Sequence, residues 1–524
     1  MTIVQYAGRS EILAGMNGCS SLCRLVVLTV IVSAVAKPAA AEQAPTVQPV
    51  SLGAKIDTFI AQPRFAAARW GIAVASLDSG RVLYVHNADR LFQPASTTKL
   101  FTAAVALSTL GPDYRIPTQV LAKEPIQNGK LDGSLWLYGM GDPTLGADPS
   151  TAAWADNLAG QLAARGLRKV SGDLVADDTY FQSPPMGSGW EAIDLQSWFG
   201  MPTSALSVDD NLVDIAIRPG RRAGMPALVA FDQTDAAPVL ANTMVTGEPR
   251  TRNDINLYRA PGSDTLHAFG NIAAGASMLR YKLAMVDPAR VAGQRLLKAL
   301  ARQGIHVEGK LHVLHWPEPS QRDGAVAVAQ VQSPSVADIL RQGLKRSQNL
   351  YMQNLLLISG AHAQDQAMSE PAPPKGFLTT EAWGIRAMRA LLDRIGVPAH
   401  ASLIEEGSGL SRRDLATPEA IVRVLSFLAA QPYAQQVYDA MPLAGVDGTL
   451  QWRMHKTPAE NNVRAKTGSM SLVHCLAGYV TAASGERLAF AIMLNNYQPP
   501  EGAPSASRDV DAIATMLAEP TSAP

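Results

Sequence analysis

The chain has 524 residues, which is too long for a single hydrophobic core and predicts two to four domains. It is 47% hydrophobic and 17% charged, a composition typical of globular proteins rather than of disordered chains or membrane bundles. Lysine and arginine together number 45, as do aspartate and glutamate, so the formal net charge is zero. This balance does not indicate a nucleic-acid or membrane-surface partner.

Residues 1–41 have the pattern of a signal for export. A basic residue precedes the apolar run 25–36, and small residues follow it up to Ala41. That order predicts cleavage after Ala41 and an exported, periplasmic protein that is soluble or loosely membrane-associated. The alternative is a membrane anchor, but the apolar run is well short of the ~20 residues that span a bilayer, so we expect no transmembrane anchor in the mature chain. Translation could begin at Met1 or at Met16.

Cysteine usage excludes an intrachain disulfide in the mature chain. Cys19 and Cys23 fall within the predicted signal, which leaves Cys475 alone. An exported compartment would permit a disulfide, but a single thiol cannot form one within the chain. We expect Cys475 to be a buried core residue.

Helices and two hairpins are predicted at the two ends of the chain. The N-terminal part predicts a helix at 54–61, a hairpin of strands 71–77 and 82–85, and a helix that starts near Ser96 and ends before Gly111. The C-terminal part predicts a strand at 463–466 and a hairpin of strands 476–481 and 487–494. Helical periodicity in that part covers 335–344, 347–359, 380–395, 418–430 and 508–517.

The middle of the chain, residues 113–325, has a different pattern. Short β-like runs alternate with Gly, Pro and Asp turns, at 133–138, 172–176, 213–218 and 310–314. Helical periodicity is confined to 152–165 and 288–303. This predicts β-rich accessory domains, two rather than one, inserted into a discontinuous α/β (α+β) domain formed by 42–112 and 326–524, whose antiparallel sheet is flanked by helices.

Ser96 to Lys99 is the only Ser-x-x-Lys sequence in the chain. On a helix, residues three positions apart share a face, so the Lys99 amine can reach the Ser96 hydroxyl. The helix N-terminus and burial both favour a neutral lysine, which could accept the serine proton and make the hydroxyl nucleophilic. On its own, the tetrapeptide favours a helix cap followed by a surface lysine, because roughly one Ser-x-x-Lys is expected by chance in a chain of this length.

Two further motifs each occur once and in an order that suits acyl transfer. Ser347 and Asn349 begin a predicted helix, where the hydroxyl could relay a proton and the amide could hold substrate and Lys99. Lys466, Thr467 and Gly468 lie on a predicted strand, followed by Ser469. Lys466 and Thr467 would bind a substrate carboxylate, and Gly468 would admit the substrate backbone. The backbone amides of Ser469 and Ser96 would form an oxyanion hole.

The conjunction of these motifs resembles the penicillin-recognising serine enzymes, which include D,D-peptidases and β-lactamases. The segment between Lys99 and Ser347 is far longer than β-lactamases place there. It resembles the class C low-molecular-mass penicillin-binding proteins, the penicillin-binding protein 4 type of D-Ala-D-Ala carboxypeptidase/endopeptidase. The resemblance covers nearly all of the mature chain and implies a penicillin-binding-protein/β-lactamase-like domain, with a discontinuous D,D-peptidase catalytic part and the inserted block.

Several other segments look like that family: 141–145, 172–174, 189–190, 204–207, 407–412, 442–445 and 447–450. In the family, positions that match Asp194, Phe199 and Arg412 line the cleft where the diamino-acid side chain of a peptide stem rests. This chain departs from the family at two positions. Ser471 replaces a longer polar side chain that many relatives carry, and Glu406 stands where relatives usually have aspartate.

The resemblance implies acyl transfer through Ser96 to a water molecule, with peptidoglycan peptides as substrates, β-lactam antibiotics as covalent inhibitors, and no cofactor or metal. A β-lactamase or esterase on the same scaffold is the first alternative, although the chain lacks the Glu-x-x-Leu-Asn motif of class A β-lactamases. A non-catalytic wall-binding protein is the second, but every motif is intact. A metallopeptidase would have to use His306, His312 and His315, which lack a ligand pattern such as H-E-x-x-H, and no G-x-S-x-G motif of a Ser-His-Asp hydrolase is present.

Overall fold

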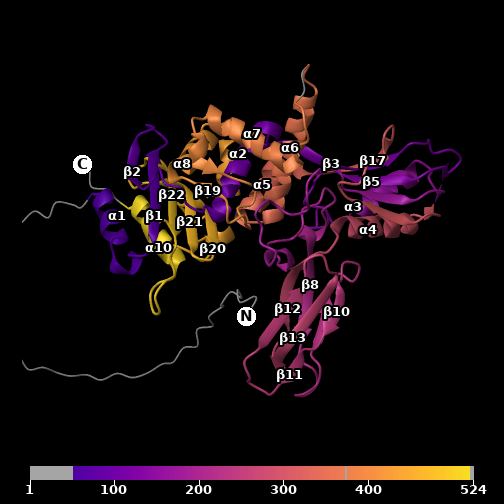
Figure 1. The fold of residues 1–524 in the computed structure, drawn as a ribbon, viewed down its shortest axis with the longest axis horizontal. Coiled ribbons are helices and arrows are strands. Elements are labelled where there is room, and N and C mark those ends of the chain that lie inside the picture. The colour runs from indigo at the N-terminus through magenta and orange to yellow at the C-terminus, as the bar shows by residue number, and fades with distance from the viewer. Residues whose placement is uncertain (1–50, 372–373, 520–524) are drawn as a thin grey trace, which may run out of the picture. The chain divides into compact units, whose positions relative to one another are not determined.

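A five-stranded antiparallel sheet joins the two ends of the chain (Figure 1). The computed structural model describes residues 51–371 and 374–519, so the predicted signal at 1–41 lies outside the described residues. In spatial order the strands are β2 (Val82–His86), β1 (Arg69–Ser76), β22 (Arg487–Asn495), β21 (Val473–Thr481) and β20 (Arg464–Met470). Because β1 pairs with β22, the two predicted hairpins are neighbours in one sheet.

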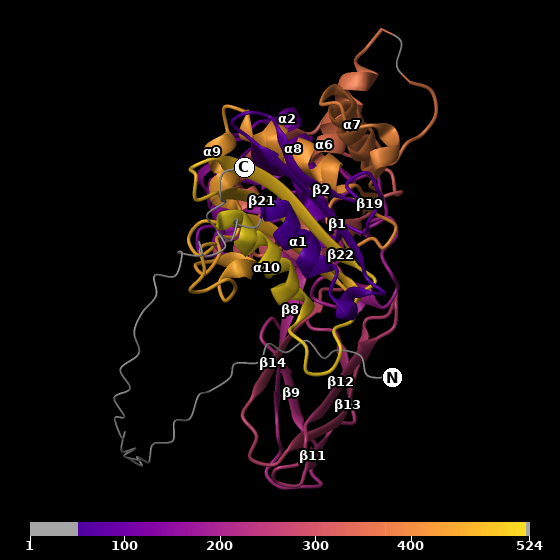
Figure 2. The same cartoon turned by 90° about the vertical axis from the view of Figure 1, so that its left-hand side faces the viewer.

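Helices cover both faces of this sheet (Figure 2). Helices α1 (Leu52–Ile60) and α10 (Ala506–Ala518) pack against one face, and α8 (Pro418–Ala429) packs against the other. The alternation of side chains along a strand sorts the two faces by size. In β1, Ile72 and Val74 point to the face that α1 and α10 cover, whereas Ala73 and Ala75 point to the face that α8 covers. The small side chains allow the second layer of helices to approach closely.

The second layer is a group of helices that carries most of the chemical motifs. It contains α2 (Lys99–Leu110), α5 (Val336–Lys345), α6 (Asn349–Met368), α7 (Thr380–Arg394) and α9 (Ala434–Ala440). Helices α2, α5, α6 and α8 share one hydrophobic core, in which α6 is buried on all sides over its first three turns. The sequence did not predict α9, and α6 continues beyond residue 359, where the expected helix ended.

Residues 115–335, here called the insert, form four further sheets. One has the order β16-β7-β5-β3-β17, one has β15-β6-β4, one has β14-β8-β9, and one has β10-β13-β11 with β12 paired to β13. The bounds of the antiparallel and parallel strands, in chain order, are β3 (Arg115–Ala122), β4 (Lys130–Leu131), β5 (Leu135–Gly139), β6 (Lys169–Val170), β7 (Leu174–Asp177), β8 (Leu212–Arg218), β9 (Leu228–Phe231), β10 (Val239–Asn242), β11 (Val245–Gly247), β12 (Asp254–Arg259), β13 (Thr265–Ala273), β14 (Leu279–Ala284), β15 (His306–Val307), β16 (Leu311–Leu314) and β17 (Val326–Ser335).

Strand pairing in the insert continues past residue 325. Strand β17, which the sequence placed in the flanking domain, pairs antiparallel with β3 along most of its length. The helices α3 (Trp154–Ala164) and α4 (Pro288–Arg302) contact each other and complete this part of the core. The chain therefore leaves the inserted sheets only where Ser335 caps α5, its hydroxyl accepting from the backbone N–H of Asp338.

Short elements make the remaining connections. A two-stranded ribbon pairs β18 (Ser402–Leu403) with β19 (Leu415–Ala416). Six 3-10 turns, named η1 to η6, are Pro63–Phe65, Ala95–Thr98, Asp194–Gln196, Asp209–Asn211, Ala399–Ala401 and Gly448–Leu450. None of the helices in the described ranges is both long and apolar enough to cross a bilayer.

Candidate active site

Ser96 lies in the 3-10 turn η2, immediately before helix α2. The sequence predicted a helix start near this residue, and the α-helix itself begins at Lys99. Ala95, which precedes the serine, has φ 47, in the left-handed region that residues other than glycine rarely adopt. A conformation of this kind costs of the order of 1–3 kcal/mol and persists only where the surroundings fix it.

Two glycines fix this turn from either side. A Cβ on Gly409 would lie 2.0 Å from the carbonyl O of Ala95, and a Cβ on Gly468 would lie 2.6 Å from the carbonyl O of Pro94. Real Cβ atoms essentially never approach another heavy atom within 3.0 Å, so both positions require glycine. In the structure, the turn that carries Ser96 lies against Gly468. The sequence had suggested instead that substrate backbone approaches this glycine.

The segment before the turn is held by the last residue of β22. The Asn495 side chain accepts from the Gln93 N–H at 2.8 Å and donates to the Gln93 carbonyl at 3.2 Å. The Gln93 side-chain amide donates to the carbonyl of Arg412 at 2.7 Å. Cys475 packs beside this segment with its Sγ 3.5 Å from the Gln93 carbonyl, and burial raises the pKa of the thiol. Cys475 is thus a neutral core residue, as expected.

The Lys99 amine is completely buried and lies 3.0 Å from the Ser96 hydroxyl oxygen. Its other two partners are Asn349 Oδ1 at 2.6 Å and the carbonyl O of Ser408 at 2.5 Å, both of which can only accept. The Asn349 amide is oriented by its Nδ2, which donates to the carbonyl of Phe199 at 2.7 Å. A neutral amine has two N–H bonds and one lone pair. With both N–H bonds directed at these acceptors, the lone pair faces the serine hydroxyl.

The electrostatic surroundings of Lys99 favour that neutral form. Burial lowers the pKa of Lys99 from 10.5 to about 7, although the nearby carboxyl groups of Glu406 and Asp414 act to raise it. Burial and the neighbouring Glu406 hold the pKa of Asp414 well above its ordinary value. At neutral pH a large fraction of Lys99 is therefore an uncharged amine in hydrogen-bond contact with a hydroxyl.

Glu406 shapes the loop that supplies the third partner of Lys99. Its buried carboxylate accepts from the backbone N–H groups of Ser408, Gly409 and Leu410 at 2.7, 2.5 and 2.9 Å, and from the Ser408 hydroxyl at 2.6 Å. These bonds fold the loop around the carboxylate. The Ser408 carbonyl consequently points toward the Lys99 amine, and Gly409 comes to lie against Ala95.

A second buried lysine lies on the strand β20. The Lys466 amine has no solvent exposure and donates to the Ser347 hydroxyl at 2.9 Å and to the carbonyl of Thr467 at 2.7 Å. The Thr467 hydroxyl donates to the hydroxyl of Thr449 at 2.8 Å. Because Ser347 contacts one lysine and Asn349 contacts the other, the start of helix α6 bridges the two amines.

The two lysines influence each other's charge. The pKa of Lys466 is held well below its ordinary value, first by burial and then by the positive charges of Lys99 and Arg453. Among the described residues, no carboxylate forms an ion pair with either lysine. A carboxylate bound beside Lys466 would offset both the cost of burying its charge and the repulsion from the other cations. The site therefore favours an anionic ligand.

Asp194, Phe199 and Arg412 are the three residues that the resemblance assigned to the cleft for a stem-peptide side chain. Burial and the nearby Glu191 raise the pKa of Asp194, while Arg412 acts to lower it. The guanidinium of Arg412 forms an ion pair with Glu191 at 2.6 Å. The carbonyl of Phe199 is the acceptor that orients Asn349, and its ring packs edge-on against that of Trp198. Ser469, the remaining predicted residue, is exposed on β20.

Comparison with known proteins now decides the family. The pattern of the D-Ala-D-Ala carboxypeptidase 3 (S13) family matches residues 52–519, almost the whole described part of the chain. The chain belongs to this S13 family. The D-alanyl-D-alanine carboxypeptidase of Actinomadura sp. (strain R39) is 34% identical over 88% of this chain and 84% of its own length.

Further relatives agree in sequence and in fold. The D-alanyl-D-alanine carboxypeptidase DacB of Haemophilus influenzae is 28% identical over 82% of this chain and 85% of its own. The crystal structure of penicillin binding protein 4 (dacB) from Haemophilus influenzae superposes with a TM-score of 0.73 at 26% identity, over 88% of this chain and 97% of that one. A structure described as that protein complexed with a β-lactam gives a TM-score of 0.68 at 24% identity, over 87% and 97% of the two chains.

These comparisons confirm the family, the fold class and the enzyme class that the sequence predicted. The S13 enzymes named above are D-alanyl-D-alanine carboxypeptidases, so this chain is a serine-type hydrolase of that class. The alternatives of a β-lactamase, an esterase or a non-catalytic protein are not favoured.

The histidines do not combine into a metal site. His312 pairs with Asp173 at 3.2 Å, and His315 pairs with Asp178 at 3.0 Å. Within residues 51–371 and 374–519, no group of three side chains is arranged to hold a metal ion. The metallopeptidase alternative therefore has no structural support in that part of the S13 chain.

Sequence reasoning overlooked several residues that position the motif side chains. Asp414 and Asn495 were not singled out, and each lies far from the motifs in the sequence. Glu406 was noted only because it stands where relatives usually have aspartate, and Thr449 only as part of a segment typical of the family. A buried carboxylate has no periodic signature, so only the loop glycines at 407 and 409 signalled that this part of the chain is unusual.

Proposed function

We propose that this S13 enzyme removes the terminal D-Ala from peptidoglycan stem peptides, and cuts D,D crosslinks, through an ester on Ser96. The observation that carries the proposal is the contact between the Lys99 amine and the Ser96 hydroxyl at 3.0 Å, with both amine N–H bonds committed elsewhere. A serine hydroxyl is a weak nucleophile, and a neighbouring base with a pKa near neutrality activates it.

The proposed acylation begins when neutral Lys99 takes the proton of Ser96. The oxygen attacks the carbonyl of the penultimate D-Ala, and the backbone amides of Ser96 and Ser469 hold the resulting oxyanion. Collapse of this intermediate breaks the peptide bond. Ser347, which contacts Lys466 at 2.9 Å, relays the proton from Lys99 to the departing amine, and Asn349 keeps Lys99 in place. In deacylation the again neutral Lys99 takes a proton from water as the water oxygen attacks the ester, and that proton then passes to the departing Ser96 oxygen, which restores the hydroxyl and neutral Lys99.

Substrate recognition would use the strand lysine. Lys466 and Thr467 bind the C-terminal carboxylate of a terminal D-Ala, because the Lys466 amine is buried without an anionic partner among the described residues. In a crosslink the amine leaving group belongs to a second stem peptide, so the same D-Ala carbonyl is attacked. Asp194, Phe199 and Arg412 would receive the diamino-acid side chain through a carboxylate, an aromatic face and a guanidinium.

β-Lactam antibiotics would acylate the same serine, since they mimic the D-Ala-D-Ala terminus. We also propose export through a signal at 1–41 to the periplasm, in a soluble or loosely membrane-associated form, and a discontinuous catalytic domain that surrounds the inserted sheets. The pairing of β17 with β3 supports placing the second boundary of the insert near residue 335 rather than 325.

Intact-mass measurement after treatment with benzylpenicillin tests the central step. We expect one stable adduct on the wild-type chain and none on the Ser96→Ala variant. The Ser108→Ala variant, which changes an exposed serine on the same helix, is the matched control and should form the adduct normally. An adduct that forms on Ser96→Ala, or that is shed within a second from the wild type, would contradict the proposal.

A further inference from the structure

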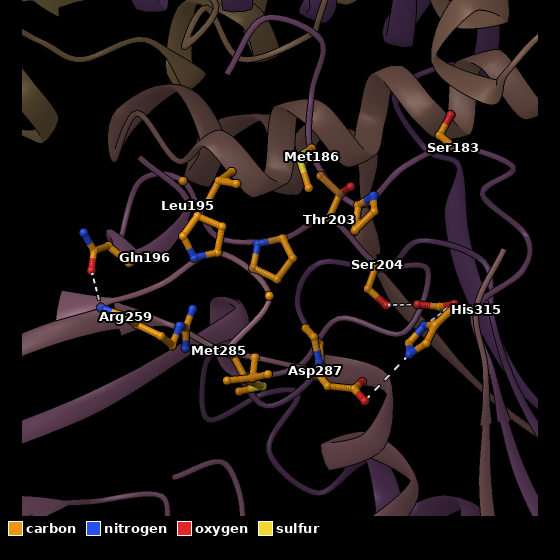
Figure 3. A pocket seen from close by; sticks show the side chains of 18 of the residues that line it. Ser183, Met186, Leu195, Gln196, Thr203, Ser204, Arg259, Met285, Asp287 and His315 are labelled. Carbon is orange, nitrogen blue, oxygen red and sulfur yellow. Dashed lines mark hydrogen bonds and ion pairs between the residues drawn. The ribbon is translucent and has the colours of Figure 1, made fainter. Parts of the chain in front are cut away.

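A cavity of about 540 Å³ is lined by residues between Asp178 and Trp316, including the segment 192–205 (Figure 3). None of the predicted catalytic or substrate-binding residues lines it. Its walls come from five parts of the chain: the loop 178–186, the segment 192–205, residues 259–263 at and after the end of β12, residues 285–288 at the start of α4, and residues 315–316 after β16. The volume is within the range of ~300–1,000 Å³ that is usual for small-molecule sites.

Arg259, the last residue of β12, is the one lining cation without a partner among the described residues. Its backbone N–H donates to the Gln196 side chain at 2.7 Å, but no carboxylate of the described residues lies within ion-pair distance of its guanidinium. Figure 3 shows the Arg259 side chain reaching into the cavity from one side. A guanidinium stays protonated even when it is partly buried, and its planar fork matches a carboxylate.

The other charged groups that line the cavity are paired with each other on the opposite wall. His315 contacts Asp178 at 3.0 Å and Asp287 at 3.7 Å. Asp178 also accepts from the Ser204 hydroxyl at 2.8 Å, and Asp287 has the guanidinium of Arg290 3.6 Å away. The two carboxylates are thus offset by two cations, which leaves the charge of Arg259 uncompensated inside the cavity.

The rest of the lining suits an organic ligand with aliphatic groups rather than a small inorganic ion. Met186, Leu195 and Met285 give flexible apolar contacts, while Ser183 and Thr203 contribute hydroxyl groups. One uncompensated cation in a cavity of this size matches a ligand with one negative charge. We propose that the cavity is a second binding site, separate from Ser96, which takes a short peptide by its C-terminal carboxylate on Arg259.

The choice of a peptide rests on the proposed function. Removal of a terminal D-Ala leaves a shortened stem peptide that ends in a new carboxylate, so the enzyme generates ligands of this class. The wall of the cavity also connects to the catalytic centre. Gly200 lines the cavity, and the adjacent Phe199 carbonyl orients Asn349, the partner of Lys99. A peptide bound at Arg259 would therefore contact the segment that positions the general base.

Binding is measured on the full chain after benzylpenicillin has filled the Ser96 centre. Two probes are titrated by calorimetry: diacetyl-L-lysyl-D-alanine with a free carboxylate, and the same peptide as its C-terminal amide. We expect the acid to bind about tenfold more tightly than the amide, since only the acid can form charge-assisted hydrogen bonds with the guanidinium. The Arg259→Gln variant should bind the acid only as weakly as the amide.

Two further variants separate this effect from misfolding. Arg252→Gln removes an exposed arginine just before β12 and should leave the affinity unchanged. Met186→Trp fills the cavity while keeping Arg259, and should weaken both probes. Thermal unfolding of each variant reports whether it is folded.

The proposal is overturned if the wild type binds acid and amide equally, if neither probe binds saturably, or if Arg259→Gln retains the affinity of the wild type. Failure of the proposed function has a different signature, namely the absence of a penicillin adduct at Ser96. In that case the same titration on Ser96→Ala still tests the cavity, because the Arg259→Gln exchange can be combined with it.

Discussion

The proposed catalytic centre and the cavity beside Arg259 both contain buried or half-buried basic groups, but the partners of these groups differ in charge. Lys99 and Lys466 are completely buried, and their partners are hydroxyl, amide and carbonyl oxygens. His315 in the cavity wall is half-exposed and lies between the carboxylates of Asp178 and Asp287. Neutral oxygen partners at the first site do not offset the cost of burying a charge, whereas carboxylate partners at the second do.

The consequence appears in the direction of the pKa shifts. Burial lowers the pKa of Lys99 to about 7, which turns a strong cation into a base that can act near neutral pH. Hydrogen bonds to Asp178 and Asp287 raise the pKa of His315 to about 10, which keeps it charged and structural. In this enzyme, burial without a counter-ion lowers the pKa of a basic group, as in Lys99 and Lys466, whereas carboxylate partners raise it, as in His315.

Replacing Lys99 by arginine should have the largest effect on the acylation rate. Lys99→Arg keeps a cation beside Ser96, but a guanidinium cannot become a neutral base at accessible pH. We expect acylation by benzylpenicillin to slow by about 10²–10⁴-fold, the usual contribution of a positioned base. Lys345→Arg, at the end of α5 where the lysine is 20% exposed and pairs with Asp447, is the control and should acylate at nearly the wild-type rate.

The pH dependence of the wild type tests the same base without a mutation. Since the proposed mechanism needs neutral Lys99, kcat/KM for a peptide amide, which takes up no proton at Lys466, should rise about tenfold per pH unit below 7 and level off above it. A rate that is flat from pH 5 to 9 would show that no amine with this pKa acts in acylation.

Lys466 tests how a buried lysine without a counter-ion responds to a substrate carboxylate. Burial and the charge of Lys99 lower its pKa, so a bound carboxylate should restore the proton. We expect Lys466→Gln to reduce kcat/KM about 100-fold for a peptide with a free D-Ala carboxylate and much less for the corresponding amide. Equal losses for acid and amide would mean that Lys466 does not bind the carboxylate.

Calorimetry on Ser96→Ala independently measures the proton that Lys466 is expected to gain when it binds a carboxylate. Titration with the acid in buffers of different ionisation enthalpy should reveal proton uptake on binding near neutral pH. The amide should bind without uptake.

Gly468→Ala tests how tightly the turn carrying Ser96 is packed. The added methyl group would lie 2.6 Å from the carbonyl O of Pro94, so backbone must move. We expect a loss of about 1–3 kcal/mol in the free energy of unfolding and slower acylation. Gly160→Ala in helix α3, where a Cβ meets no atom within 4 Å, should instead be neutral or stabilising.

His315 gives the smallest effect. Its pKa is raised from the ordinary 6.5 to about 10, so its contribution to stability is fully present below pH 6.5 and is lost as pH rises through about 10. Because the side chain is half-exposed, the contribution is at most about 1 kcal/mol. Chemical denaturation of wild type and His315→Gln at pH 6, 8 and 10 should show a difference that shrinks as pH rises, and a constant difference would exclude the charge as its cause.

The elements were predictable where the pattern is local. The two hairpins, the helices α2, α5, α7, α8 and α10, and the helices α3 and α4 of the insert lie close to the expected ranges. Helix α9 was missed because it is only two turns long and follows another helix closely. The pairing of β17 with β3 was missed because strand partners far apart in the sequence leave no trace in the periodicity of either one.

The amino-acid sequence alone determined the three motifs, their order and the helix or strand on which each lies, because these depend on residue type and on spacing within a few residues. Only the tertiary structure decided that the Ser408 carbonyl joins Ser96 and Asn349 around the Lys99 amine, that Gly409 and Gly468 fix the strained Ala95, and that Arg259 faces a cavity without a counter-ion. The physical reason is that a pKa and a close contact depend on what surrounds an atom, and these neighbours come from segments hundreds of residues apart.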